Sequence, residues 1–533
     1  MALMQLSLFL TTTIILLTSG HVAFVNAGTF LVVPIDGSHW LSMRPVVDIM
    51  VQKGHHAVIV APDINIFLKA SQESNWEVKF YPVSYTLQQL QDHLSSFTYE
   101  LFTQRPALEK ITKTHKTMKE GTALMFDNCA RLLNNSQLIQ SLEEMTFDVV
   151  FTDALLPCGQ ILAEHLSVPS VFFLHGLPCH LDAKASQCPI PLSYVPRMMT
   201  GLTEHMTFPQ RVKNLLYELV MSLMCDLVYS PYEQLATEFL KKDVNLQEIL
   251  GHAAIWLLKI DFALDFPRPM MPNMITIGGI NCAQKKPLNQ DFENLVNSSG
   301  EHGFVVFSLG SMVSEIPMNK AMDIAEALGS IPQTVIWRYT GKVPSNLANN
   351  THLVKWLPQN DLLAHPKVRA FITHAGSHGI YEGICNAVPM VMLPLFGDQM
   401  DNAKRIESRG AGVTLNVLDM TPEDLSNALD RVINDPSFKK NIDRLSALHL
   451  DRPVHPLDLA VHWVEFVMRH KGAPHLRPAA HDLNWIQYHS LDVFAFLLAV
   501  LVTTLFISFK CCTYTCRRCC GRKSRPKSKS KKE

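Results

Sequence analysis

Short apolar runs alternate with helical stretches along most of the chain, and this alternation constrains the fold more than any other feature. The segment at 40–54, between two such runs, has the pattern of a helix. Strands alternating with helices form a parallel sheet whose faces the helices cover. In the first half of the chain we predict strands at 29–34, 57–61, 148–152, 170–174 and 226–229.

A second series of apolar runs follows a polar stretch at 281–303, which we interpret as a linker. The predicted strands of this series are 304–309, 333–339, 370–373, 390–394 and 412–415. The fold class is therefore α/β, with two Rossmann-like doubly wound domains, 28–280 and 304–440, facing a cleft. Ligands of such sheets bind at the carboxyl ends of the strands. Residues 441–490 are predicted to be helical and to pack back toward the membrane and the N-terminal domain.

The run VFAFLLAVLVTTLFISF at 493–509 carries no charge. As a helix it is about 26 Å long, which matches a thin bilayer such as that of the endoplasmic reticulum. A buried core helix is the alternative, but a basic tail follows the run at once. We predict a C-terminal transmembrane helix at 491–509.

The charge of the chain is divided unevenly at this helix. The whole chain has 47 Lys and Arg against 48 Asp and Glu, and residues 510–533 hold ten basic residues and one acidic residue. Subtraction leaves 37 basic and 47 acidic residues before 510, a net of −10. The basic tail predicts the cytosolic side of the membrane. A near-neutral total gives no indication of a nucleic-acid partner, and 47% hydrophobic residues exclude wholesale disorder.

The N-terminus has an apolar segment at 6–17, followed by Val25-Asn26-Ala27. Small residues at these positions are typical of signal-peptidase sites, so 1–27 is a predicted signal peptide. An uncleaved anchor is the alternative, because no Lys or Arg precedes Arg44. With a C-terminal span, cleavage gives a single-pass type I membrane protein with most of its mass lumenal.

Two further features fit the endoplasmic reticulum. Asn134, Asn297 and Asn349 begin N-x-S/T sequons. The final residues KSKKE resemble the dilysine retrieval signal of that membrane, although a basic tail also attracts anionic lipid. The seven cysteines before the span are odd in number, so at least one is free or intermolecular if the others pair.

Two glycine-containing turns follow predicted strands of the second series. HAGSHG at 374–379 joins a strand to a helix, and SLGS at 308–311 follows another strand. Backbone amides at a helix N-terminus can hold an anion, so the two turns together suit a diphosphate. Taken singly, each is also consistent with an ordinary turn.

The segments WLPQNDLLAHP, FITHAGSHGIYE and PMVMLPLFGDQMDNA, around 356–399, resemble the nucleotide-sugar signature of the UDP-glycosyltransferases. The likeness covers essentially the whole chain, including DGSHW near the N-terminus. The chain is similar to the vertebrate UDP-glucuronosyltransferases of family 1, the bilirubin and phenol type. This likeness implies a GT-B fold. It also implies transfer of glucuronic acid from UDP-glucuronate, a co-substrate, to a hydroxyl, amine or carboxyl of phenols, steroids or bilirubin. No cofactor is expected. The chain is expected to form homo-oligomers, or hetero-oligomers with related transferases.

The resemblance also implies roles for single positions. Trp356 stacks on uracil, Gln359 bonds the base or ribose, and Glu382 binds ribose hydroxyls. Asp398 and Gln399 hold sugar hydroxyls. The diphosphate faces Ser308, Ser311, His374, Gly376, His378 and Gly379. Alone, Trp356 is equally consistent with core packing, and Asp398-Gln399 with a helix cap.

His39 and Asp153 form the predicted catalytic pair. His39 lies in the turn after the first strand, and Asp153 follows the strand at 148–152, so both lie on one sheet edge if the two strands belong to one sheet. Imidazole can act as a base at neutral pH, and a carboxylate can orient it. The family resemblance assigns base and partner to these positions and implies inversion at the anomeric carbon. A cap or turn role is the alternative for Asp153 alone.

A cation is expected near the carboxylate of a glucuronate donor. Arg338 is one candidate, although it can also lie beside the base. Lys259 is the other candidate, at a position where relatives often carry Arg. A lysine keeps the positive charge of an arginine, but it lacks the planar guanidinium that binds a carboxylate through two N–H groups. We predict no metal site. Another donor sugar (glucose, xylose or galactose) and a non-catalytic membrane partner stay open as alternatives.

Overall fold

The computed structural model describes residues 27–68, 76–282 and 285–520. The predicted signal peptide, apart from residue 27, and the KSKKE terminus lie outside the described residues. The two predicted sheets belong to one compact unit that ends at Leu476, and residues from Arg477 onward form a second unit.

The first sheet has seven strands in the order β3-β2-β1-β4-β5-β6-β7, and every neighbouring pair is parallel. Its strands are β1 (Thr29–Val33), β2 (His56–Pro62), β3 (Glu77–Tyr81), β4 (Val149–Thr152), β5 (Ser170–Leu174), β6 (Ile255–Leu258) and β7 (Met274–Thr276). Its helices are α2 (Ser38–Gln52), α3 (Leu87–Leu101), α4 (Ala107–Leu133), α5 (Ser136–Glu143), α6 (Cys158–Leu166), α7 (Leu181–Ser186), α8 (Phe208–Leu240) and α9 (Leu246–Leu250), with a 3-10 turn, η2 (Pro178–His180).

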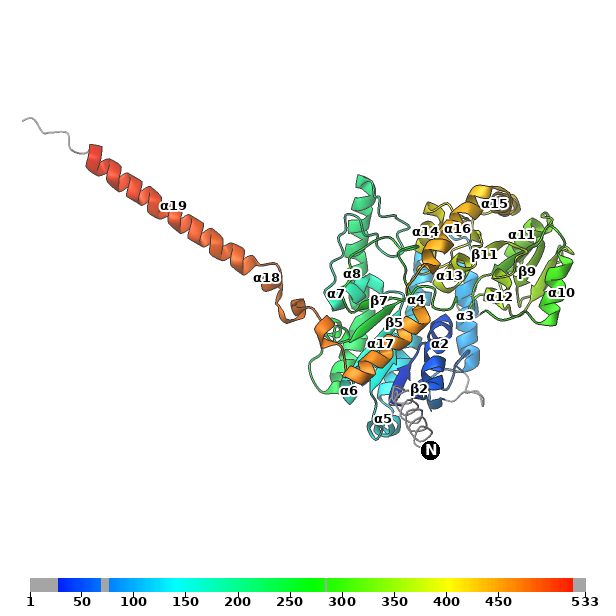
Figure 1. The fold of residues 1–533 in the computed structure, drawn as a ribbon, viewed down its shortest axis with the longest axis horizontal. Coiled ribbons are helices and arrows are strands. Elements are labelled where there is room, and N and C mark those ends of the chain that lie inside the picture. Colours follow the sequence, from blue (N-terminus) through cyan, green and yellow to red (C-terminus); the bar gives the residue numbers. More distant parts are fainter. Residues whose placement is uncertain (1–26, 69–75, 283–284, 521–533) are drawn as a thin grey trace, which may run out of the picture. The chain divides into compact units, whose positions relative to one another are not determined.

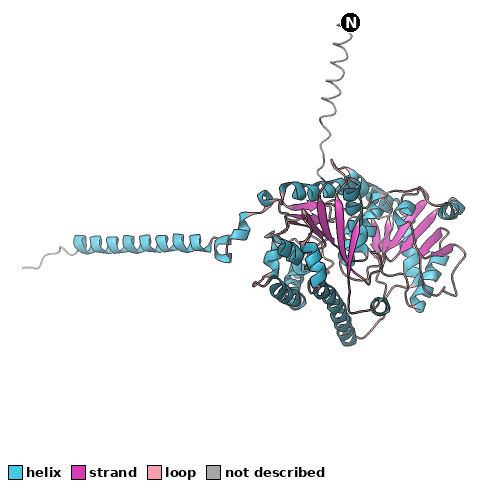
Figure 2. Cartoon of the chain, turned by 90° about the horizontal axis from the view of Figure 1, so that it is seen from below, coloured by secondary structure: helices cyan, strands magenta, loops and turns pink. Residues whose placement is uncertain are grey.

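The second sheet has six strands in the order β10-β9-β8-β11-β12-β13, again all parallel. Its strands are β8 (Phe304–Ser308), β9 (Thr334–Arg338), β10 (Thr351–Val354), β11 (Val368–Thr373), β12 (Met390–Met392) and β13 (Gly412–Thr414). Its helices are α10 (Gln290–Ser298), α11 (Met318–Gly329), α12 (Gln359–Leu363), α13 (Ser377–Cys385), α14 (Gln399–Ser408), α15 (Pro422–Asn434) and α16 (Pro436–Leu450). Figure 2 shows both sheets flanked by helices.

Both faces of each sheet are buried, which explains why the strands read as continuous apolar runs. Successive side chains of a strand point to opposite faces. Leu31 packs in one core cluster and Val32 in another, on the other side of the first sheet. Val305 and Val306 divide in the same way between the two faces of the second sheet. The prediction of two doubly wound domains is confirmed.

Helix α17 (Pro456–His470) returns from the second sheet to the first. It contacts α2, β4, β5 and β6, and its apolar stripe belongs to a core cluster of the first sheet. Figure 1 shows α17 beside α2. The buried Glu465 on this helix pairs with Lys53 at 2.5 Å and with His55 at 3.3 Å. The chain therefore crosses between the two sheets twice, at 278–282 and before α17.

The second unit holds η4 (Ala479–Asp482), α18 (Trp485–Tyr488) and α19 (Leu491–Cys520); η3 (Pro474–Leu476) closes the first. Helix α19 is long and apolar enough to cross a membrane. It begins where the predicted span begins and continues past residue 509 into the basic tail. The sequence therefore placed the apolar helix correctly, and the helix is longer than the uncharged run.

Two differences from the predictions concern secondary structure. The predicted strand at 226–229 is wrong, because these residues lie inside α8. A short apolar run alone does not distinguish a strand from a helix. Helix α8 starts with a capping box formed by Thr207 and Gln210, which favours a continuous helix through the run. The predicted linker also contains α10, which the polar composition did not indicate.

Three disulfides lie in the first unit: Cys129–Cys158, Cys179–Cys225 and Cys282–Cys385. Cys188 is the remaining thiol of the seven, in agreement with the odd count. The bridge at Cys282 joins the crossing between the sheets to α13. Cys282, Cys385 and His449 form a potential metal-ligand group among the described residues, but both sulfurs are already bonded to each other.

Candidate active site

His39 and Asp153 meet at the carboxyl edge of the first sheet. His39 is in the first turn of α2, directly after the β1 turn, and Asp153 directly follows β4. His39 Nδ1 lies 2.6 Å from Asp153 Oδ2, and Asp153 Oδ1 accepts the Leu155 N–H at 3.0 Å. His39 is about one-third exposed, whereas Asp153 is buried. The far nitrogen of the imidazole is therefore free to act on a ligand while the carboxylate fixes the ring.

Asp153 stays ionised despite its burial. Burial raises the pKa of this carboxyl, but the charge and hydrogen bond of His39, the Lys259 charge and the Leu155 N–H outweigh it, so the net pKa is lowered. A buried carboxylate that remains charged stabilises a positive charge on the neighbouring ring. The pair can therefore remove a proton from a ligand hydroxyl.

The two turns of the second domain lie against each other. Gly310 has φ +86°, and a Cβ there or on Gly376 would lie within 2.6 Å of the His374 ring. Both glycines are thus needed for the ring to fit between them. Burial lowers the pKa of His374 to about 4, so the ring is neutral at pH 7, and its Nδ1 has no hydrogen-bond partner among the described residues. This arrangement leaves a neutral, unsatisfied ring between two amide-rich turns.

Arg338 supports the 308–311 turn from the end of β9. Its guanidinium donates to the carbonyl of Gly310 and, at 3.2 Å, to that of Ser311. Its Cζ lies 5.4 Å from the ring centre of Trp356. Ser308 Oγ accepts the Gly310 N–H at 3.2 Å. Arg338 therefore lies beside Trp356, which favours the base-side interpretation over contact with a sugar carboxylate.

Trp356 is 55% exposed and faces the first domain. Its ring centre is 6.5 Å from that of Phe67, whose backbone N–H donates to Asp36 at 3.1 Å. A large aromatic ring left this exposed does not serve core packing, so that alternative is wrong for Trp356. The exposed face is suited to stack on a planar ligand.

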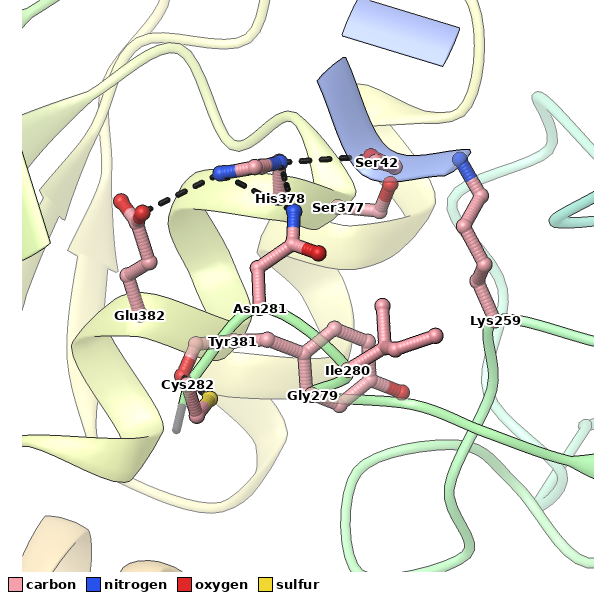
Figure 3. A pocket seen from close by; sticks show the side chains of 10 residues that line it. All are labelled: Ser42, Lys259, Gly279, Ile280, Asn281, Cys282, Ser377, His378, Tyr381 and Glu382. Atoms are coloured by element: carbon pink, nitrogen blue, oxygen red, sulfur yellow. Dashed lines mark hydrogen bonds and ion pairs between the residues drawn. The ribbon is translucent and has the colours of Figure 1, made fainter. Parts of the chain in front are cut away.

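Gln359, Glu382 and His378 form one hydrogen-bonded row. Gln359 Nε2 donates to Glu382 Oε2 at 2.5 Å, and His378 Nε2 lies 3.1 Å from Glu382 Oε1. His378 Nδ1 also contacts Asn281 at 2.7 Å and Ser42 at 3.3 Å. Figure 3 shows His378 between these partners. His378 therefore links α13 to α2 and to the crossing at 278–282, a role that the sequence did not indicate.

A cavity of about 290 Å³ lies beside this row and includes Lys259 in its lining. Lys259 follows β6 and is buried, with its ammonium 5.6 Å from the Phe173 ring centre. Burial lowers the pKa of Lys259, and the charges of Asp153 and Asp398 partly oppose that shift. The buried amine of Lys259 thus interacts with both the predicted catalytic carboxylate and the predicted sugar-binding carboxylate.

Asp398 and Gln399 stand at the start of α14. Gln399 Oε1 accepts the N–H groups of Leu395 and Phe396, at 2.8 and 3.1 Å, so its carbonyl is already used. Asp398 Oδ2 accepts from Asn402 at 2.8 Å and lies 3.6 Å from His175 Nε2. His175 comes directly after β5, in the same position relative to its strand as Asp153, and that placement could have identified it from the sequence.

Gly379 lies within α13, and Gly376 caps its N-terminus. The structure thus brings every predicted donor-binding residue to one side of the cleft and the catalytic pair to the other. An aromatic face, two amide-rich turns and a carboxylate–amide pair face a histidine–carboxylate base.

This architecture, with its site between two doubly wound sheets, defines a glycosyltransferase of the GT-B fold. Solved structures of the same fold include the calicheamicin glycosyltransferase CalG4, with a TM-score of 0.56, 17% identity, and coverage of 83% of this chain and 99% of that one. Os79 from O. sativa in complex with UDP gives a TM-score of 0.53 at 16% identity over 82% of this chain and 100% of that one.

The family model described as "UDP-glucoronosyl and UDP-glucosyl transferase" matches residues 28–526, and the chain belongs to this family. UDP-glucuronosyltransferase 1A1 of Homo sapiens is 59% identical over 506 residues, which cover 95% of each chain. UDP-glucuronosyltransferase 1A1 of Mus musculus is 60% identical over 95% of this chain and 94% of its own. The resemblance predicted from the sequence is confirmed.

Proposed function

We propose that the protein transfers glucuronic acid from UDP-glucuronate to a hydroxyl, amine or carboxyl of small lipophilic acceptors such as phenols, steroids or bilirubin. The observation that carries the proposal is the 2.6 Å contact between His39 and Asp153. His39 Nε2 takes the acceptor proton, and the acceptor oxygen attacks the anomeric carbon in line. UDP leaves, and the α-linked donor gives a β-glucuronide.

His39→Ala tests the base. Transfer to a phenol is expected to fall below detection, while UDP binding stays within about twofold, because His39 contacts the acceptor proton and not the nucleotide. Full activity in this variant refutes the assignment. An α-linked product from the unaltered protein refutes the in-line inversion.

For the donor side we propose that Lys259 pairs with the carboxylate of glucuronate. The support is its burial and its interaction with the charges of Asp153 and Asp398. A buried cation facing an anionic group favours it over a neutral hydroxymethyl. Lys259→Met is expected to lower kcat/KM for UDP-glucuronate at least about tenfold relative to UDP-glucose, and Lys259→Arg to retain the preference. An unchanged donor ratio in the Met variant supports the alternative of another donor sugar.

A non-catalytic membrane partner is the second alternative, and transfer by the purified chain alone excludes it. The intact catalytic pair and donor-side residues favour an enzyme. The chain is expected to need no cofactor or metal for the chemical step. Assembly with a second copy or a related transferase stays a prediction.

We further propose that the protein is a single-pass type I protein of the endoplasmic reticulum membrane, with its catalytic mass lumenal and its tail cytosolic. Helix α19 supplies a candidate span. Asn134, Asn297 and Asn349 are all exposed, as sugar attachment requires. Three disulfides favour an oxidising compartment. Endoglycosidase sensitivity in sealed microsomes tests this orientation, and an accessible catalytic mass without detergent refutes it.

A further inference from the structure

A second cavity extends from the cleft into the first domain. Its space of about 720 Å³ reaches from Asp398 and His175, at the reaction side, to Asp182 on α7. Asp398 is the predicted sugar-binding carboxylate, so a molecule in this cavity lies next to the donor sugar. The inference below rests on the proposed function, because it concerns the acceptor of that reaction.

Asp182 is the carboxylate among the polar side chains of this cavity that have a buried atom left without a hydrogen bond, a set that also includes His180, Arg197 and Arg405. Its residue is 3% exposed, and its Oδ1 has no hydrogen-bond partner among the described residues. A buried acceptor left without a donor is costly, and such atoms are rare in folded proteins.

The cations that line the cavity do not satisfy this carboxylate. Arg197 Nε is 2.7 Å from Glu218, and Arg405 Nε is 3.3 Å from Asp265. Within the described residues, no ion pair to Asp182 occurs at 4.0 Å or less. The lining of the cavity therefore includes a carboxylate that has no cation partner among the described residues.

The backbone just before Asp182 is strained. Cys179 and His180 have φ of 58° and 53°, a conformation that side-chain-bearing residues rarely adopt. The disulfide from Cys179 to Cys225 ties this turn to α8. Strain of this kind persists where the surrounding structure over-determines it, and it clusters at ligand sites.

The opposite wall of the cavity is held from both domains. Asn214 of α8 accepts the Arg197 N–H at 2.8 Å. Asp401, in α14 of the second domain, accepts the N–H groups of Met199 and Gly201 at 2.5 and 3.0 Å. The cavity is thus preformed between fixed walls, and its lining includes Leu177, Val195, Met198 and Leu202 as apolar surface.

We propose that Asp182 is a specificity-determining residue that accepts a hydrogen bond from a second polar group of the acceptor, a hydroxyl or an ammonium, remote from the hydroxyl that reacts. The apolar wall holds the body of the acceptor, the reacting end lies toward His175 and Asp398, and the other end donates to the Asp182 carboxylate. Acceptors with a donor at both ends are the preferred class.

The test uses phenols that carry a para alkyl chain of three to six methylenes ending in methyl, hydroxyl or ammonium. The unaltered full-length protein is expected to show a kcat/KM at least about tenfold higher for the hydroxyl or ammonium end than for the methyl end at one chain length, the size of one hydrogen bond to a charged group. The direction of this preference distinguishes the two kinds of pocket, because a purely apolar pocket gives the higher kcat/KM for the methyl-ended phenol. The absence of any such preference at every length overturns the proposal.

Two variants assign the effect to the residue. Asp182→Leu is expected to remove the preference while kcat/KM for the methyl-ended phenol stays within about twofold. Asp182→Asn keeps an acceptor oxygen without the charge, so it retains the hydroxyl preference and loses the ammonium preference. Asp243→Asn, an exposed acid outside the cavity, is the matched control.

The remaining outcomes are also decisive. An equal loss for all three acceptors in a folded Asp182→Leu protein indicates a structural role and overturns the proposal. If the Leu variant fails to fold, the hydroxyl-to-ammonium ratio of the Asn variant decides, and an unchanged ratio overturns it. Transfer to methyl-ended phenols without a preference refutes only this inference, whereas no transfer to any phenol refutes the proposed function together with it.

Discussion

The substitution Asp153→Asn tests whether the carboxylate orients His39, while it leaves intact the hydrogen bond by which Asp153 supports the local backbone. The two oxygens of Asp153 have different partners: Oδ1 accepts the Leu155 N–H, and Oδ2 faces His39 Nδ1. In the Asn variant only the carbonyl oxygen can accept from Leu155, so the NH₂ group faces His39. It then donates to Nδ1, and the ring must carry its own proton on Nε2. The base is present but holds the wrong tautomer.

The magnitude follows from this geometry. The variant loses both proton acceptance at Nε2 and the buried charge that stabilises the imidazolium. In the comparable change of the serine protease triad the loss is about 10⁴ in kcat. We expect about 10³ to 10⁴ here, or about 4 to 5.5 kcal/mol of transition-state stabilisation. Volume and the Leu155 bond are conserved, so stability should change little.

The assay is steady-state glucuronidation of a simple phenol, with UDP affinity and thermal unfolding measured on the same samples. KM for UDP-glucuronate and UDP affinity are expected to stay within about twofold, because the nucleotide side lies in the other domain. Asp243→Asn serves as the control and should match the unaltered protein. A loss of less than about tenfold in kcat, with folding intact, refutes the orienting role of Asp153.

Three further predictions test other parts of the structure. Trp356→Ala should weaken UDP binding about tenfold or more in calorimetry, because an exposed stacking face is lost, and an unchanged affinity contradicts the base site. Because burial holds the pKa of His374 at about 4, against about 6.5 when unfolded, the unfolded chain binds the proton first as pH falls. The contribution of neutral His374 to the free energy of unfolding is therefore fully present above about pH 6.5, and about 1–3 kcal/mol of it is lost toward pH 4. His374→Asn should reduce this dependence of the unfolding temperature on pH. A chain ending at Ser490 lacks α19 and should leave the membrane fraction on alkaline extraction, whereas continued retention shows a second anchor.

Much of the fold could be read from local patterns. Strands buried on both faces are continuous apolar runs, so most strands of both sheets were identified from the sequence. The same rule failed at 226–229, because a run of three apolar residues after Asp226 fits a helix equally well. The strands β3, β6, β7 and β10 were missed, and β3 at the sheet edge is the most polar of them, with burial only at its last residue.

The site was predictable where residues follow strands. His39 and Asp153 each come after a strand of one parallel sheet, so the topology brings them to one edge whatever their separation in sequence. The contacts across the cleft were not predictable in this way. Asp401 holding the 199–201 backbone, and His378 bonding to Ser42, join residues 200 or more positions apart on different domains.

The sequence by itself therefore determined the fold class, the family, the pairing of His39 with Asp153 and the apolar helix that divides an acidic mass from a basic tail, because each depends on local pattern or on strand order. The tertiary structure alone decided which polar groups remain unsatisfied. It places Arg338 beside Trp356, buries Lys259 where it interacts with two carboxylates and leaves Asp182 without a cation partner in a preformed cavity. Burial and hydrogen bonding are properties of packed neighbours, and neighbours in space are fixed only when both domains close around the cleft.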